Sequence, residues 1–316
     1  MEFGFVMKSI AIIGSGNWAE ALSKILKPTK LIIKCRSIKK QKGNFNSSKI
    51  SITDNFNDIN GSEIIFIAIP SQTIRENLMS LKKTKKNHRL FVSCSKGVEK
   101  KTFKLMSQVI NEIYPRSKVA ILSGPNFSSE LINKKPSASV LSAKNESTLR
   151  EVSKLILAEK FRIYFNNDMI GTQVGGAMKN IIAIACGYIT GLELGENAKA
   201  AIITRGLSEI INLGIKMGAK RSTFYGLSGI GDLTLSCSSL KSRNAKFGYE
   251  LAKSNNNILK KSVLLEGIES CDSICELGRK YKVELPISKS VRSIINGGNV
   301  NKIINDLLSR PIQFEK

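Results

Sequence analysis

The feature that most constrains the fold is a strand, a glycine-rich turn and a helix near the start of the chain. Apolar residues 10–13 run directly into Gly14-Ser15-Gly16-Asn17-Trp18-Ala19, and a helix pattern follows. Gly14 allows a tight turn, Gly16 lets the backbone approach a pyrophosphate, and the small Ala19 lets the helix pack on the strand. An ordinary strand-turn-helix connection is the alternative. The placement between a strand and a helix predicts a dinucleotide-binding turn.

The end of the next strand bears on the choice of cofactor. This strand pattern, at residues 31–35, ends at Arg36 and Ser37. Folds that prefer NAD carry an acidic residue here for the ribose hydroxyls, whereas a cation suits the extra 2′-phosphate of NADP. We therefore predict NADPH as the preferred cofactor, with NADH as the second choice and Arg36 as a contact. The alternative is that Arg36 is one more surface charge.

The order of the patterns predicts the fold class. Strand patterns occur at residues 10–13, 31–35, 64–69, 90–93, 119–122, 137–141 and 161–165, with helix patterns between them. After residue 168 the patterns are helical, at residues 176–188, 197–213, 243–253, 266–281, 286–295 and 300–308. Repeated βα units form a parallel sheet, and ligands bind at the carboxyl ends of its strands. We predict an α/β protein with a Rossmann-type doubly wound domain over residues 1–167 and an all-helical substrate domain over residues 168–316.

Composition argues against several classes of protein. The net charge of +24 would by itself suggest a nucleic-acid binder, but the basic residues are scattered and no aromatic residues are interleaved with them. No apolar run is long enough to span a bilayer, and the N-terminus carries Glu2 and reaches its first strand too soon for a signal peptide. We therefore expect a cytoplasmic enzyme with no nucleic-acid partner and no membrane span.

Cysteine and histidine usage argues against a metal site. The six cysteines form no C-x-x-C pair, and His88 is the only histidine. A single histidine also argues against a Ser-His or Cys-His nucleophile, because His88 has no nucleophile motif near it. Hydride chemistry with a lysine needs neither group.

One lysine stands in an otherwise apolar helix pattern. Lys179 lies within residues 175–186, where most neighbours are small or apolar. A buried ammonium loses its hydration, so such a lysine needs polar partners or exchanges its proton readily, which suits a general acid. The alternative is a lysine at a helix end whose ammonium reaches water. The dinucleotide turn elsewhere in the chain favours the catalytic interpretation.

Further segments are suited to bind a ligand. Ser95-Lys96-Gly97 and residues 123–130 each follow a strand, and residues 226–233 carry Asp232 in a glycine-rich loop. Ser242-Arg243-Asn244 opens a helix, where a guanidinium and backbone amides together can bind phosphate. Taken singly, each segment could equally be an ordinary turn or helix cap.

Together these segments resemble one family, the bacterial NAD(P)-dependent glycerol-3-phosphate dehydrogenases. The matching motifs run in order over essentially the whole chain, at residues 14–19, 95–97, 123–127, 175–180, 204–207, 229–233, 242–244 and 265–267. The resemblance implies a homodimeric cytoplasmic enzyme that interconverts sn-glycerol 3-phosphate and dihydroxyacetone phosphate. It implies mainly reduction of the ketone, which supplies the glycerol backbone of phospholipids.

The resemblance also implies roles for individual residues. Lys179 matches the family's proton donor and acceptor, and Lys96 a position that binds both substrate and cofactor. The other substrate-binding matches are Gly124, Asn126, Asp232, Ser242, Arg243 and Asn244. Beside Gly14 and Gly16 of the turn, the cofactor-binding matches are Asn17, Trp18, Arg36, Ser128, Arg243, Leu264 and Glu266. Residues that depart from the usual family pattern are Ala19, Glu20, Asn126 and Ser128.

These residues predict hydride transfer to a ketone carbon while Lys179 protonates the growing alkoxide and Lys96 adds positive potential. Asp232 would orient an amine or a substrate hydroxyl, and Arg243 with Asn244 would anchor the phosphate. The alternative is another Rossmann reductase of the β-hydroxyacid or ketopantoate type, which would share the turn and a catalytic lysine without needing the phosphate site.

Overall fold

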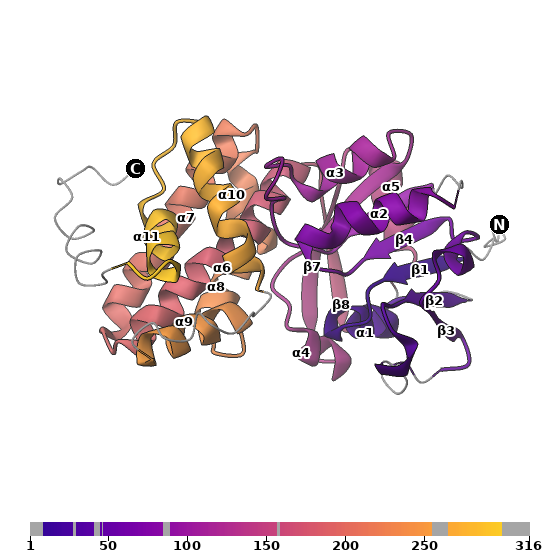
Figure 1. The fold of residues 1–316 in the computed structure, drawn as a ribbon, viewed down its shortest axis with the longest axis horizontal. Coiled ribbons are helices and arrows are strands. Elements are labelled where there is room, and N and C mark those ends of the chain that lie inside the picture. The colour runs from indigo at the N-terminus through magenta and orange to yellow at the C-terminus, as the bar shows by residue number, and fades with distance from the viewer. Residues whose placement is uncertain are drawn as a thin grey trace.

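The computed structural model describes residues 9–27, 30–40, 45, 47–84, 89–156, 159–254 and 265–298. Figure 1 shows a sheet with helices on its two faces, packed against an assembly of helices. The first half of the chain forms the sheet and the second half forms the helical assembly. His88, Leu264 and the helix predicted at residues 300–308 lie outside the described residues.

The sheet has eight strands in the order β3-β2-β1-β4-β5-β6-β7-β8. Neighbouring strands are parallel except for β6 and β7, which are antiparallel. The predicted doubly wound sheet is thus confirmed, and its strand order reverses between β1 and β4, the point where such sheets bind ligands. The strands are β1 (Ile10–Ile13), β2 (Leu31–Lys34), β3 (Ile50–Thr53), β4 (Ile64–Ile67), β5 (Leu90–Ser93), β6 (Lys118–Ser123), β7 (Ser137–Ala143) and β8 (Phe161–Asn166).

The strand patterns do not predict β3, the edge strand beside β2. Its sequence Ile50-Ser51-Ile52-Thr53 alternates in polarity, and Ser51 is exposed. Such alternation is typical of a half-buried strand, but four residues are the shortest run that shows it, so the pattern does not stand out in the sequence.

Alternate strand residues enter two separate cores. In β1, Ile10 and Ile12 join the core beneath α1 (Asn17–Ile25), α4 (Ser128–Ile132) and α5 (Glu146–Ser153). Ala11 and Ile13 join the core beneath α2 (Ile74–Lys82) and α3 (Met106–Ile113) on the other face. Both faces of the sheet are therefore covered, which explains the continuously apolar central strands.

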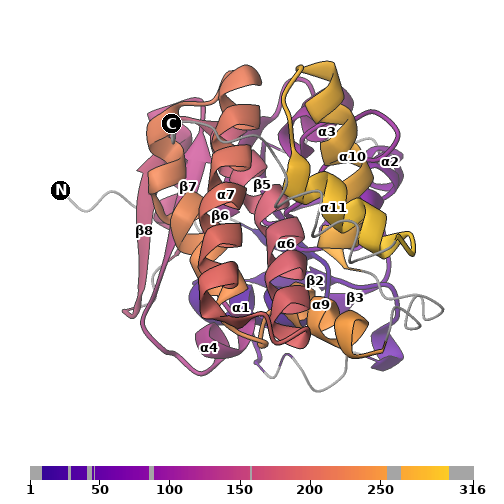
Figure 2. The same cartoon turned by 90° about the vertical axis from the view of Figure 1, so that its left-hand side faces the viewer.

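The helical assembly is built around α6 (Met169–Gly191), whose residues are nearly all buried. It packs against α7 (Gly195–Lys216), α8 (Asp232–Cys237), α9 (Arg243–Lys253), α10 (Glu266–Lys280) and α11 (Pro286–Ile295). Figure 2 shows α6 and α7 side by side. Helix α6 begins at the N-cap Asp168, whose carboxylate accepts hydrogen bonds from Gly171 N, Lys220 N and Thr223 Oγ1, each at 2.8 Å. This cap ties the start of α6 to the short helix η4 (Arg221–Tyr225).

None of the helices in the described part of the chain combines the length and the apolar character needed to cross a membrane.

Candidate active site

The turn after β1 leaves room for a dinucleotide. Gly14 has a φ of +119°, and a Cβ there would lie 2.3 Å from the carbonyl oxygen of Ala68. A Cβ on Gly16 would meet nothing within 4 Å, and no side chain caps the N-terminus of α1 that Gly16 begins. Free amides at a helix N-terminus bind anions such as a pyrophosphate. Asn17 is exposed and Trp18 half-buried at the start of this helix.

Two other predicted cofactor contacts lie near this turn. Arg36 follows β2, the strand paired with β1, and is exposed. Ser128 is half-buried at the start of α4, which packs against α1.

Two lysines from distant segments share one buried carboxylate. Lys179 of α6 donates to Asp232 Oδ1 at 2.6 Å, and Lys96, from the loop after β5, donates to Asp232 Oδ2 at 2.5 Å. Asp232 begins α8 and is fully buried. The tertiary structure therefore brings together three of the predicted site residues, with one negative charge between two positive charges.

Each ammonium keeps one N–H group without a partner among the described residues. An ammonium has three donors. Besides Asp232, Lys179 donates to Ser236 Oγ at 2.8 Å, and Lys96 donates to the carbonyl oxygen of Gly124 at 3.0 Å. The remaining donor on each lysine is available to a ligand oxygen.

The surroundings of Lys96 make its proton labile. Burial lowers the pKa of Lys96 to about 8; Asp232 opposes this shift and the charge of Lys179 adds to it. A lysine with a lowered pKa still carries positive charge at neutral pH, and it can respond to small changes in local charge.

Lys96 packs closely against a glycine of α6. A Cβ on Gly176 would lie 3.4 Å from Lys96 Cγ and 3.2 Å from Ser123 Oγ. The stem of Lys96 therefore lies directly against α6, one turn before Lys179. A larger side chain at residue 176 would push the Lys96 stem and the end of β6 away from α6.

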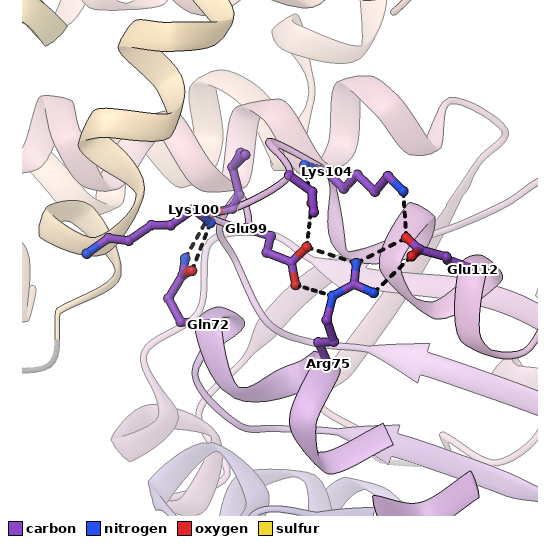
Figure 3. A network of polar contacts seen from close by, with 8 residues as sticks. Gln72, Arg75, Glu99, Lys100, Lys104 and Glu112 are labelled. Atoms are coloured by element: carbon purple, nitrogen blue, oxygen red, sulfur yellow. Dashed lines mark hydrogen bonds and ion pairs between the residues drawn. The ribbon is translucent and has the colours of Figure 1, made fainter. Parts of the chain in front are cut away.

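A cluster of charged side chains holds the segment that follows Lys96 (Figure 3). Arg75 of α2 donates to both carboxylate oxygens of Glu99, at 2.8 and 2.9 Å, and to both of Glu112, at 3.0 Å each. Lys104 also donates to Glu112, at 2.5 Å. Arg75 and Lys104 lower the pKa of Glu112 to about 2.

Gln72 fixes the backbone of the same segment. Its side chain donates to Val98 O at 2.8 Å and accepts from Lys100 N at 3.0 Å. Across the junction with α10, Val98 N donates to Ser270 Oγ at 3.3 Å. The loop that carries Lys96 is thus bonded on one side to the sheet domain and on the other to the helical assembly.

The predicted cofactor residue Glu266 joins the same two parts of the molecule. It begins α10, and its carboxylate accepts from Ser71 N at 2.8 Å and Ser71 Oγ at 2.5 Å. Ser71 follows β4 in the short helix η3 (Ser71–Thr73). Burial raises the pKa of Glu266, and the hydrogen bonds from Ser71 and the charge of Arg243 oppose that shift.

The predicted phosphate segment divides into one exposed and two buried residues. Ser242 is the N-cap of α9 and accepts from Ala245 N at 3.4 Å. Asn244 is buried, donates to Asn180 Oδ1 at 3.1 Å and accepts from Gly267 N at 3.2 Å. Arg243 alone is exposed. In this structure the Asn244 amide therefore links three helices, and the guanidinium of Arg243 is the part of the segment open to an anion.

The loop after β6 places the remaining predicted substrate residues. Gly124 has a φ of +140° and contributes the carbonyl oxygen that Lys96 binds. The amide of Asn126 donates to Ala138 O at 2.9 Å and Ser139 Oγ at 2.7 Å, at the start of β7. The donor side of the Asn126 amide is thus used to hold the loop on the sheet.

Sequence reasoning does not find Ser236 and Asn180, although both touch predicted site residues. Ser236 lies four residues after Asp232 on α8, so both side chains lie on one helix face and reach Lys179. The sequence signal that could have identified Ser236 is its spacing of four residues from Asp232, which places the two side chains on the same face of a helix. Asn180 directly follows Lys179 but contacts Asn244 instead.

The described residues include no cluster of three histidine, cysteine or acidic side chains that could hold a metal ion. All six cysteines are buried and free.

Two family models match the chain. The model of the NAD-dependent glycerol-3-phosphate dehydrogenase N-terminus matches residues 40–149, and the model of the C-terminus matches residues 168–305. A glycerol-3-phosphate dehydrogenase (NAD(P)+) of Zymomonas mobilis is 39% identical over 269 residues, which are 84% of this chain and 78% of the relative. The protein of the same name from Fusobacterium nucleatum is 35% identical over 331 residues, covering 98% of this chain and 99% of the relative.

A solved structure shares the complete fold. The crystal structure of glycerol-3-phosphate dehydrogenase from Coxiella burnetii has a TM-score of 0.89 and 29% sequence identity to this chain. The match covers 96% of this chain and 99% of that chain.

The shared carboxylate generates a prediction about proton affinity. Asp232→Asn should lower the pKa of Lys96 below its value of about 8, because the carboxylate favours the charged ammonium and the amide does not. A pH titration of ¹³C-labelled lysine side chains by NMR, with Lys96 assigned by Lys96→Arg, measures this shift. Asp272→Asn, which neutralises an exposed carboxylate of α10, is the control and should leave Lys96 unchanged. An unchanged or raised pKa in Asp232→Asn would contradict the prediction.

Proposed function

This chain belongs to the NAD-dependent glycerol-3-phosphate dehydrogenase family, and we propose that it reduces dihydroxyacetone phosphate to sn-glycerol 3-phosphate for glycerophospholipid synthesis. The observation that carries the proposal is the pair of ammonium groups on Asp232, each with one unused donor. Family membership favours this reaction over the β-hydroxyacid and ketopantoate alternatives.

The lysine pair is suited to stabilise and protonate a developing oxyanion. The glycine turn and the amides of α1 would hold the pyrophosphate of a reduced nicotinamide dinucleotide, which would supply the hydride. Asp232 balances one of the two ammonium charges, so the group keeps a net positive charge toward a ligand oxygen. Lys179 donates the proton as the ketone oxygen gains negative charge, and Lys96 adds a second positive charge beside it. Ser236 and Asp232 hold the Lys179 ammonium in one place, which limits reorganisation during the reaction.

Arg243 is proposed to bind the phosphate of the substrate. Its exposed guanidinium lies at the N-terminus of α9, where backbone amides and the helix dipole also favour an anion. A bound phosphate fixes the distance of the carbonyl group from the lysines. Ser242 and Asn244 support this position as the helix cap and as the link between α6, α9 and α10.

Several finer assignments belong to the same proposal. NADPH is the preferred cofactor because Arg36 stands where NAD-preferring folds carry an acid. Residues 1–167 bind the cofactor and residues 168–316 contribute most of the substrate site. The enzyme is a cytoplasmic homodimer without a nucleic-acid partner.

A direct assay tests the proposed reaction. The purified protein should consume NADPH in the presence of dihydroxyacetone phosphate, with loss of the nicotinamide absorbance, and should use NADH less well. Ketopantoate and a β-keto acid serve as alternative substrates in parallel reactions. Turnover of either alternative in preference to dihydroxyacetone phosphate would contradict the proposed substrate.

Removal of the proposed general acid should abolish most turnover. Lys179→Met should lower kcat by about a hundredfold or more, the scale of a general acid, while the protein stays folded by circular dichroism. Lys216→Met, which removes an exposed charge near the end of α7, is the matched control and should keep normal turnover. Normal turnover of Lys179→Met would end the assignment of this lysine.

Removal of the proposed phosphate ligand should act mainly on substrate binding. Arg243→Ala should raise the KM for dihydroxyacetone phosphate by about tenfold or more, because a charge-assisted contact to phosphate is lost. Lys246→Ala removes an exposed charge from the same helix and is the control. An unchanged KM in Arg243→Ala would count against the phosphate site.

A further inference from the structure

Lys34, the last residue of β2, is a buried ammonium that forms no ion pair with an acidic side chain of the described residues. Only 8% of the residue is exposed. Its Nζ donates to the carbonyl oxygen of Cys35 at 2.9 Å and lies 4.2 Å from the centroid of the Phe56 ring. No carboxylate of the described residues lies within ion-pair distance of it. Burial lowers the pKa of Lys34, and the charges of Cys35 and Asp54 oppose this shift without cancelling it.

Lys34 differs from the two active-site lysines in the partners of its ammonium. Lys179 and Lys96 are also largely buried, but both bind the carboxylate of Asp232. A buried charge without a counter-charge is strongly destabilising, and a cation–π contact offsets only a part of that cost. The Lys34 ammonium is therefore a place where an anionic ligand would gain a strong interaction.

The fold places this ammonium beside the cofactor turn. The carbonyl oxygen of Lys34 accepts a hydrogen bond from Gly14 N at 2.9 Å, so the end of β2 is joined to the first glycine of the turn. Arg36 follows two residues later and is exposed. In a Rossmann domain the adenosine ribose of the dinucleotide lies at the end of the second strand. Two cations that bind no carboxylate in the described part of the chain thus stand where the ribose 2′ position is expected.

We propose that Lys34 is a specificity-determining residue that binds the 2′-phosphate of NADP(H) together with Arg36. Arg36 approaches the phosphate from the exposed side, and the Lys34 ammonium approaches it from the sheet. The ring of Phe56 holds the ammonium when no phosphate is present and releases it to the stronger dianion. This inference rests on the proposed use of a nicotinamide dinucleotide, and it concerns the choice between NADP and NAD.

Nucleotide binding without turnover tests the inference separately from the reaction. Calorimetry with 2′,5′-ADP and with 5′-AMP measures the contribution of the 2′-phosphate, and 3′,5′-ADP tests whether any second phosphate suffices. In Lys34→Met the Kd for 2′,5′-ADP should rise about tenfold or more, the worth of one charge-assisted contact, with a much smaller change for 5′-AMP. The ratio of the KM for NADPH to that for NADH should rise by a similar factor.

The matched control is Lys49→Met. Lys49 is exposed, and its carbonyl oxygen binds Leu31 N at the opposite end of β2, so this variant removes one charge from the same sheet edge. It should leave the binding of all three nucleotides unchanged. If Lys34→Met lowers the melting temperature sharply, Lys34→Gln replaces it, since the amide can keep the bond to Cys35 O.

Three results would overturn the proposal. One is an equal loss of affinity for 2′,5′-ADP and 5′-AMP in the Lys34 variants, which would indicate a structural role only. Another is an unchanged affinity of the Lys34 variants for 2′,5′-ADP. The third is a wild-type protein that binds 2′,5′-ADP no more tightly than 5′-AMP or 3′,5′-ADP. Failure to reduce dihydroxyacetone phosphate would instead contradict the proposed reaction and would leave these binding results to be judged on their own.

Discussion

The buried carboxylate of Asp232 is the contact on which the candidate active site depends. It receives an ammonium on each oxygen, from Lys179 on the central helix and from Lys96 on a loop of the sheet domain. Without this carboxylate, two like charges would face each other in a poorly hydrated place, which is strongly unfavourable. With it, the lysines stay close together and keep a net positive charge, which is the electrostatic requirement for stabilising an oxyanion.

Contacts around the site hold the side chains of Lys179, Lys96 and Asp232 in position. Glycine at residue 176 lets Lys96 lie against α6, and Arg75 with its two glutamates fixes the segment that follows Lys96. The contact between Glu266 and Ser71 joins α10 to the loop after β4. The Glu266–Ser71 bonds and the packing of Lys96 on Gly176 cross between the sheet domain and the helical assembly, so the geometry of the lysine pair depends on how the two parts pack. A site of this kind is precise because its supporting bonds come from regular elements on both sides.

Lys34 shows the opposite treatment of a buried charge. Its ammonium rests on a carbonyl oxygen and an aromatic ring, neither of which carries a full negative charge. In the active site the protein supplies the counter-charge itself, whereas at the end of β2 it leaves that place to a ligand. Burying an ammonium carries a desolvation cost at both places. In the active site Asp232 offsets this cost and positions the lysines for catalysis. At the end of β2, in our proposal, the phosphate of the cofactor offsets it, which makes the site selective for NADP(H).

The sequence by itself determined the elements and the class of fold. The glycine turn at residues 14–19, the alternation of strands and helices, and the helical second half follow from local periodicity and from the conformational freedom of Gly14. Lys179 stood out because it is the one charge in an apolar helix pattern. The edge strand β3 was missed because its alternating pattern is only four residues long.

Only the tertiary structure decided which groups neutralise each buried charge. Lys96 and Asp232 are 136 residues apart, and Lys179 and Asp232 are 53 apart, so no local pattern links them. The use of Asn244 as a link between helices, the contact of Ser236 with Lys179 and the carbonyl partner of Lys34 were likewise decided by packing. Periodicity determines which face of an element is buried, but the partner of a buried charge is set by where distant elements meet.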